Sequence, residues 1–264
     1  MRAKRSLGQN FLHDQTIIKR IIDALILGRE ETVVEIGPGQ GALTEHLLVK
    51  ADTVIAVEFD RDMVSLLRER FGSSNSFHLI NDDALNVNFA GILRRTSAGK
   101  TKLVANLPYN ISTPILQRLM DQRHLFSSLV LMFQREVVER IAATEGGKDR
   151  GFLSVLVENA FYTEYLFEVP PQAFQPVPKV WSAVVRLTPK QSSITDEALF
   201  RKIVSISFSQ KRKNILNNLK TNFPDAAAIL ERSGIDGKRR AETLTLHEWI
   251  ILTKTIEKND RTVD

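Results

Sequence analysis

One stretch near the N-terminus constrains the fold more than any other: a β-branched run that leads directly into a cluster of glycines. The run is Thr32–Ile36, and Gly37-Pro38-Gly39-Gln40-Gly41 follows it, before an apolar pattern of helical spacing over 42–50. Glycines between a strand and a helix permit a tight turn and let the backbone approach a ligand. Because glycine turns are also ordinary, the stretch gains its meaning from what comes after it.

The alternation of strand and helix continues along the chain. Short apolar strands are predicted at 54–57, 77–80, 102–105 and 129–133, with helices at 15–26, 61–71 and 114–125. Strands that alternate with helices form a mostly parallel sheet covered on both faces, so the expected fold class is α/β. Two later strands, at 162–169 and 180–187, are joined by a loop without a helix. That connection predicts an antiparallel strand at the edge of the sheet.

The sequence changes character after Pro189. Gln191-Ser192-Ser193 is typical of a linker. Only helical patterns follow it, at 197–207, 214–219, 226–232 and 246–256. Two further helices are predicted before it, at 137–142 and 153–161. We therefore expect two domains, with residues 1–189 containing the sheet and residues 190–264 forming a small all-α domain.

Composition excludes several classes of site. The 264 residues include no cysteine, which excludes disulfides, thiolate metal sites and a cysteine nucleophile, and the five scattered histidines lack metal-ligand spacing. No apolar run approaches the roughly 20 residues that cross a bilayer. The basic segment Met1–Asn10 is not followed by the apolar core of a signal peptide. We expect a cytoplasmic protein without a metal or a membrane partner.

Positive charge is concentrated at the two ends of the chain. Residues 1–20 hold five Lys and Arg against one Asp, and residues 190–264 hold fourteen against ten acidic residues, a net of +4 in each case. Residues 21–189 carry a net of −3, from seventeen basic and twenty acidic residues. This distribution suggests a polyanionic partner held by the terminal segments, although mildly basic tails are common in soluble proteins.

Acidic residues end the strands that flank the glycine cluster. Glu58 lies 21 positions after Gly37, where a carboxylate can accept both hydroxyls of a ribose, and Asp83 follows the third strand, where it can accept from an adenine amine. The carboxyl ends of parallel strands meet at one crevice, which predicts an adenosine-containing cofactor, either a dinucleotide or S-adenosylmethionine. Glu35 favours the latter, because a carboxylate there would repel a pyrophosphate. It would serve the aminoacyl end directly or by ordering the loop, unless it is a solvated strand-end carboxylate.

Asn106-Leu107-Pro108-Tyr109 follows the fourth strand of this series. Pro108 stiffens the turn, so that the Asn106 amide oxygen and nearby carbonyls can face outward as acceptors beside the ring of Tyr109. Converging acceptors next to an aromatic plate suit a planar ring that carries an exocyclic NH₂. The alternative is an ordinary strand-end turn.

Taken in order, these motifs resemble the ribosomal RNA adenine dimethyltransferases. The resemblance rests on Gln9-Asn10-Phe11-Leu12, Glu35–Gly41, Glu58, Asp83-Ala84-Leu85, Asn106–Tyr109, Phe174-x-Pro176-x-Pro178-Lys179-Val180 and Phe208–Lys213, and covers the whole chain. It is closest to the bacterial enzymes that dimethylate two adjacent adenosines near the 3′ end of small-subunit (16S) ribosomal RNA, in ribosome biogenesis. It implies a Rossmann-like class I methyltransferase sheet.

The resemblance also implies roles for individual residues. It implies S-adenosylmethionine contacts at Asn10, Leu12, Gly37, Glu58, Asp83 and Asn106, and a target adenosine held by Asn106, Leu107, Pro108, Tyr109 and Phe174. Acceptors at Asn106 and at a carbonyl of Leu107 or Pro108 would take the two amine hydrogens, so no general base is expected. The base would be extruded and stacked between Tyr109 and Phe174. The implied partner is small-subunit ribosomal RNA or the 30S subunit, bound by a monomer.

Candidates for phosphate contacts are basic residues in the helical domain and the N-terminal arm, namely Lys211, Arg212, Lys213, Lys238-Arg239-Arg240, Arg2, Lys4 and Arg5. Any one of them can instead belong to a solvated charged face. Three other functions remain open: the related large-subunit adenine methyltransferases that confer macrolide resistance, a ribosome-assembly factor that mainly binds, and a nicotinamide-dependent oxidoreductase. Glu35 and the lack of a hydride-transfer site count against the last.

Overall fold

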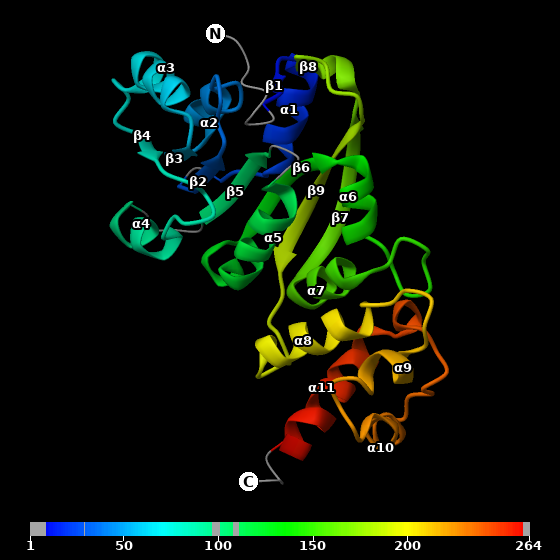
Figure 1. Cartoon of the computed structure of the whole chain (residues 1–264). Helices are drawn as coiled ribbons and strands as arrows, with labels where there is room; N and C mark the ends of the chain where they lie inside the picture. Colours follow the sequence, from blue (N-terminus) through cyan, green and yellow to red (C-terminus); the bar gives the residue numbers. More distant parts are fainter. Residues whose placement is uncertain (1–8, 29, 97–100, 108–110, 261–264) are drawn as a thin grey trace. The chain divides into compact units, whose positions relative to one another are not determined.

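The structure is a computed structural model that describes residues 9–28, 30–96, 101–107 and 111–260. The chain folds into two compact units (Figure 1). The first, or sheet unit, runs to Val138 and resumes over Tyr162–Pro189; the second, or helical unit, contains Glu139–Phe161 and the residues from Lys190 onward. The sequence-based division kept 139–161 with the sheet. The structure groups this segment with the later helices, because α7 (Phe152–Ala160) packs against two of them, α8 (Glu197–Ser207) and α11 (Leu246–Asp260).

The sheet unit is built on seven strands in the order β4-β3-β2-β5-β6-β9-β7. They are β2 (Thr32–Ile36), β3 (Thr53–Glu58), β4 (Phe77–Asn81), β5 (Thr101–Asn106), β6 (Ser128–Gln134), β7 (Phe161–Val169) and β9 (Ser182–Pro189). The strands from β4 to β6 pair in parallel, and β9 pairs antiparallel with β6. The predicted fold class, a mostly parallel sheet with an antiparallel strand toward one edge, is confirmed.

Helices cover the sheet because their apolar residues recur at helical spacing. The helices of this unit are α1 (Gln15–Ala24), α2 (Thr44–Lys50), α3 (Arg61–Phe71), α4 (Phe89–Thr96) and α5 (Ser112–Asp121), with 3₁₀ turns η3 (Arg123–Leu125) and η4 (Pro171–Ala173). The buried face of α1 joins Leu47 of α2 and Leu67 of α3 in one core with Val33 and Val54 of the sheet. The Asp14 side chain accepts from the first amides of α1 and fixes where that helix begins.

A second, very small sheet joins segments that lie far apart in the sequence. Strand β1 (Phe11–Leu12) pairs antiparallel with β8 (Phe174–Gln175), and Leu12 lies opposite Phe174 in the register. The His13 amide extends the ladder by donating to the Ala173 carbonyl over 3.0 Å. The N-terminal segment is thereby tied to the loop that precedes β9.

The helical unit has a core of its own. Its further elements are part of α6 (Arg135–Ile141), α9 (Ile215–Leu219), α10 (Ala226–Arg232) and η5 (Ala241–Thr243). Trp249 is fully buried and stacks on Phe208 with the ring centroids 6.0 Å apart. Asn218 donates through Nδ2 to the carbonyls of Ser207 and Gln210, which holds the chain before residues 211–213 in a fixed path. Among the described residues, no helix is both long and apolar enough to cross a membrane.

Candidate active site

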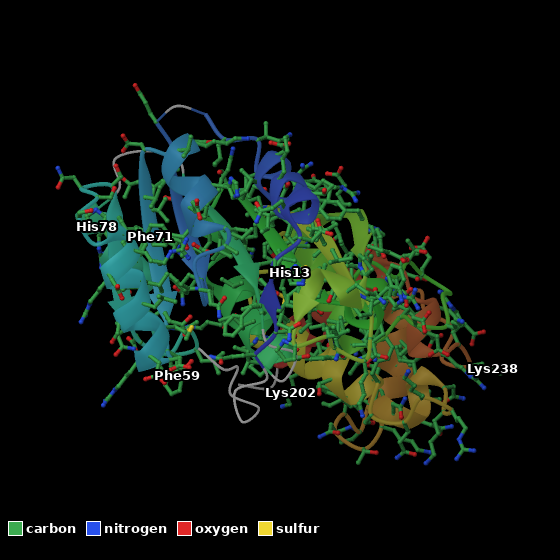
Figure 2. The ribbon with its side chains drawn as sticks, turned by 90° about the horizontal axis from the view of Figure 1, so that it is seen from above. His13, Phe59, Phe71, His78, Lys202 and Lys238 are labelled. Carbon is green, nitrogen blue, oxygen red and sulfur yellow. The ribbon has the colours of Figure 1, made fainter. Side chains whose placement is uncertain are left out.

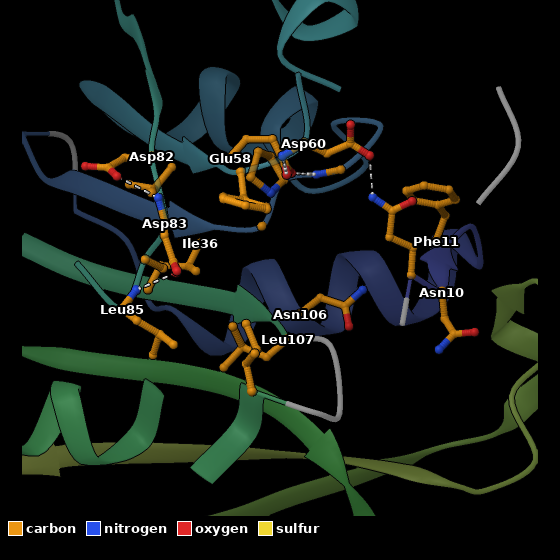
Figure 3. Close-up of a pocket in the computed structure, with 18 of the residues that line it drawn as sticks. Asn10, Phe11, Ile36, Glu58, Asp60, Asp82, Asp83, Leu85, Asn106 and Leu107 are labelled. Carbon is orange, nitrogen blue, oxygen red and sulfur yellow. Dashed lines mark hydrogen bonds between the residues drawn. The ribbon is translucent and has the colours of Figure 1, made fainter. Parts of the chain in front are cut away.

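A pocket opens at the carboxyl ends of the parallel strands of the sheet unit (Figure 3). Its wall combines the segment before α1, the glycine loop and the ends of β3, β4 and β5. The lining residues are Gln9, Asn10, Phe11, Ile36, Gly37, Pro38, Gly39, Val57, Glu58, Phe59, Asp60, Asp82, Asp83, Ala84, Leu85, Asn106, Leu107, Ile111 and Phe174. The topology explains why these segments lie together, because an open α/β sheet places the loops that follow its parallel strands at the same carboxyl end.

The glycine loop approaches this pocket with its backbone. Gly39 has a φ of +55°, a conformation that favours glycine, and its amide donates to Glu58 over 3.0 Å. A Cβ at Gly39 would lie 3.1 Å from the ring of Phe11. At Gly41, with a φ of +85°, a Cβ would come within 2.5 Å of Phe71. The glycines are therefore required by a turn packed between two aromatic rings.

Glu58 is the most highly organised carboxylate of the pocket. One oxygen accepts from the Gly39 amide, and the other accepts from the Asp60 amide over 2.8 Å. The side chain is only 7% exposed. Burial raises the pKa of Glu58, while the amides of Asp60 and Gly39 favour the charged form. Because each carboxylate oxygen has a second lone pair, the group can still accept hydroxyl donors from the pocket.

Glu35 is not among the residues that line the pocket. It is buried, so the alternative of a solvated strand-end carboxylate is wrong. It is 2% exposed and accepts a hydrogen bond from the Thr44 hydroxyl over 2.6 Å. Burial raises the pKa of Glu35 to about 7, opposed by the Thr44 hydrogen bond and reinforced by the charge of Glu58. Of the two roles considered from the sequence, ordering of the loop fits this position, because the bond joins the end of β2 to the start of α2.

Asp83 follows β4, and one of its carboxylate oxygens accepts a hydrogen bond from the backbone two residues later. Oδ1 accepts from the Leu85 amide over 2.9 Å, and the Asp83 amide donates to Asp82 over 2.8 Å. Figure 3 shows both contacts beside Ile36 and Leu85, on the wall opposite Asn10. These two local hydrogen bonds fix the direction of the Asp83 side chain, so that the carboxylate presents an acceptor next to apolar groups.

Asn106 ends β5, and Leu107 follows it as a buried residue; both line the pocket (Figure 3). The register places Asn106 opposite Met132 of β6. Phe174 is 1% exposed, and it is at once part of the pocket wall and of the core around α1. Pro108 and Tyr109 lie outside the described residues.

The segment before α1 closes one side of the pocket. Gln9 donates through Nε2 to Oδ2 of Asp60 over 2.9 Å, and Asn10 and Phe11 belong to the wall. Leu12, the remaining residue of this predicted set, is buried and pairs with Phe174 but does not line the pocket. Gln9, Phe11 and Asp60 were not predicted, although their position next to motif residues was a usable signal.

Phe59 is a further residue of the wall that the sequence analysis missed. Phe59 directly follows Glu58 in the sequence and is 59% exposed, a large fraction for a phenylalanine. Figure 2 labels its side chain. An aromatic ring at the rim offers a face on which a planar ligand can stack. Within the part of the chain that the structure describes, no group of His, Cys, Asp or Glu is arranged to hold a metal ion.

The candidate phosphate contacts of the helical unit fall into two classes. Lys211, Arg212 and Lys213 are exposed, as is Lys238 (Figure 2). Arg239 instead forms a bidentate pair with Glu248 and bonds Thr243, so that it serves the structure of the unit. Arg240 lies 3.8 Å from Glu242 in an exposed ion pair. Arg2, Lys4 and Arg5 lie outside the described residues.

Comparison with known proteins gives a family and close relatives. The model of the family described as "Ribosomal RNA adenine dimethylase" matches residues 1–258. A "Ribosomal RNA small subunit methyltransferase A" from Geobacter sulfurreducens is 44% identical over 262 residues, which cover 96% of this chain and 95% of that protein.

Two solved structures share the fold over nearly the whole chain. A dimethyladenosine transferase from Plasmodium falciparum is 29% identical with a TM-score of 0.81 and covers 95% of this chain and 98% of its own. The 23S rRNA methyltransferase ErmE is 25% identical with a TM-score of 0.69 and covers 94% of this chain and 100% of its own.

Proposed function

Because the chain belongs to the ribosomal RNA adenine dimethylase family, we propose that it transfers methyl groups from S-adenosylmethionine to N6 of two adjacent adenosines near the 3′ end of small-subunit (16S) ribosomal RNA, two to each. The observation that carries the proposal is the single pocket that holds Glu58, Asp83 and Asn106 together. This activity belongs to ribosome biogenesis in the cytoplasm, with the 30S subunit as partner and the protein acting as a monomer.

The chemistry of the pocket fits an adenosyl cofactor. Glu58 retains lone pairs for ribose hydroxyls, Asp83 offers an acceptor for an adenine amine, and Ile36, Val57 and Leu85 supply apolar walls for a base. Asn10, Gly37 and Asn106 complete the proposed contacts, and Leu12 supports them through its pairing with Phe174. When bound, S-adenosylmethionine supplies an electrophilic methyl group on a positively charged sulfur.

The target adenosine is proposed to bind between this cofactor site and the residues after β5. The Asn106 side-chain oxygen and the carbonyl of Leu107 or Pro108 accept the two hydrogens of the exocyclic amine. An amine held in this way keeps its lone pair directed at the reacting carbon, and its acceptors face the positive charge that develops on nitrogen. No strong base is needed, because the product cation loses its proton readily.

Phe174 and Tyr109 are proposed to stack on the extruded base. Phe174 reaches the pocket from the small sheet, where Leu12 fixes its strand. The sheet domain, which we take as residues 1–189 with the N-terminal arm, performs the chemistry. The helical domain, residues 190–264, supplies phosphate contacts through its exposed lysines and arginines.

Three observations favour this reaction over the alternatives. The relative named for the small subunit is 44% identical, whereas the structure named for 23S rRNA is 25% identical. The acceptors of a methylation site, Asn106 and Leu107, line the same pocket as Glu58, which counts against a protein that only binds. A nicotinamide enzyme is disfavoured by the family itself.

The proposal is tested by incubating the protein with methyl-labelled S-adenosylmethionine and small subunits that lack these methyl groups, followed by digestion to nucleosides. We expect label in N6,N6-dimethyladenosine from two adjacent positions of the 16S rRNA. Label in large-subunit rRNA alone, or no transfer, would reject the proposed function.

A further inference from the structure

Trp181 stands out among the exposed apolar residues of the sheet unit. It is 44% exposed, and Val177 and Val180 on the same loop are 56% and 41% exposed. Lys179 lies between them and is also exposed. The loop carries no core function for these side chains, yet its first residues continue directly from Phe174, which lines the pocket.

The register of the sheet places Trp181 near Asn106. Asn106 pairs with Met132, and Met132 pairs with Val184 of β9, so Asn106 and Val184 are separated by two strand spacings. Because β9 runs antiparallel, Trp181 lies three residues beyond Val184 toward the carboxyl ends of the parallel strands. Strand geometry then gives a separation of about 14 Å between the backbones of Asn106 and Trp181.

The backbone of Trp181 is held in place. Its carbonyl accepts from the Arg135 amide over 2.9 Å at the start of α6, and Ser182 pairs with Gln134 in the next register position. The two-residue period of a strand, continued to its ends, directs the Trp181 side chain to the face of Leu107, which is opposite the face of Asn106. A fixed, exposed indole therefore lies on the face of the sheet where Leu107 contributes to the pocket.

We propose that Trp181 is a stacking platform for a nucleotide that flanks the target adenosine. The inference rests on the proposed function. An indole ring stacks on any base, and the separation from Asn106 suits the neighbour of an extruded base. The exposed cation of Lys179 provides positive charge for a polyanion, whereas Arg135 at the base of the loop is paired with Glu168 over 3.7 Å.

The fluorescence of this protein offers a selective test. The chain has only two tryptophans, and Trp249 is fully buried while Trp181 is not. Titration of the full-length protein with an RNA hairpin that contains two adjacent adenosines should quench the emission of Trp181. The same titration of W181F should leave the emission unchanged, although this variant should bind the hairpin within about twofold of wild type.

W181A tests the energetic contribution. Loss of one base stack predicts a dissociation constant for the hairpin about tenfold higher. Y162A is the matched control, because Tyr162 is 66% exposed but lies at the amino end of β7, an edge strand that contributes no residue to the pocket. It should bind like wild type.

Hairpins with an abasic residue on either side of the adenosine pair separate stacking from other effects. At one of these positions, removal of the base should weaken wild type about tenfold and leave W181A unaffected. The inference would be overturned if each abasic substitution weakened the binding of W181A as much as that of wild type. It would also be overturned if W181A bound the intact hairpin as tightly as wild type. Weaker binding of W181A to assembled subunits alone would overturn it too, because that result would indicate a protein contact. Methyl transfer by the wild type, measured in parallel, distinguishes a failure of this inference from a failure of the proposed function.

Discussion

Glu35 accepts a hydrogen bond from the Thr44 hydroxyl over 2.6 Å, and this bond between a buried acid and a helix residue connects the two ends of the glycine loop. The acid is held where its charged form is poorly solvated. This relationship links the stability of the sheet unit to the protonation of one carboxyl group.

The first prediction concerns pH. The pKa of Glu35 rises from 4.5 to about 7 on folding, so the folded state binds more protons than the unfolded state between these values. Stability from this group is therefore fully present below about pH 4.5 and is lost as pH rises toward 7, by an amount on the order of 3 kcal/mol. Urea unfolding of wild type and E35Q at pH 5 and pH 8 measures it.

E35Q keeps an oxygen for Thr44 and removes the ionisation, so its free energy of unfolding should change less between these pH values. E45Q, at an exposed residue of the same helix region, is the control and should behave like wild type. If E35Q and wild type lose the same stability between pH 5 and pH 8, Glu35 is not the group responsible.

The second prediction concerns Asn106. N106A removes the proposed acceptor for the target amine, so methyl transfer should fall by at least about a hundredfold, comparable to loss of a preorganised hydrogen-bonding group. Binding of S-adenosylhomocysteine, measured by calorimetry, should weaken only a few fold, because Glu58 and Asp83 remain. Turnover at the wild-type rate would remove the proposed role of Asn106.

The third prediction concerns the contact between Gln9 and Asp60, which closes the N-terminal side of the pocket. Q9E places two carboxylates together and should raise the dissociation constant of S-adenosylhomocysteine about tenfold. D60N keeps the N-cap of α3, because an asparagine oxygen can accept from the Asp62 amide. The double variant Q9E/D60N restores a hydrogen bond of reversed polarity and should recover most of the affinity. Additive losses in the double variant would show that the contact does not matter.

The fourth prediction concerns the basic segment before α9. K211Q/R212Q/K213Q should lower RNA affinity and reduce the slope of log K against log salt by about 2, if all three residues contact phosphates. R61Q/R68Q/R94Q removes three exposed positive charges from the sheet unit and serves as the control for net charge. An unaltered slope in the triple variant would place these residues away from RNA.

Local patterns predicted the parallel sheet and most of its helices, because each strand and helix shows its own periodicity. Helix α4 was missed, since it is only eight residues long and contains Gly91, a residue of low helix propensity. The pairing of Leu12 with Phe174 was also missed, because strands of two residues have no periodicity and their partners are far apart in sequence.

The candidate site was predictable wherever a strand end carries the functional group, as at Glu58, Asp83 and Asn106. It was not predictable where tertiary contacts decide a side chain's environment. The sequence could not show that Glu35 faces Thr44, or that Gln9 reaches Asp60 across 51 positions.

The most direct test of the central claim is a crystal structure of the protein with S-adenosylhomocysteine and adenosine. The account predicts the ribose hydroxyls of the cofactor product at Glu58, its adenine near Asp83, and the amine of the second nucleoside at Asn106. Binding of S-adenosylhomocysteine elsewhere, or an adenosine whose amine points away from Asn106, would contradict it.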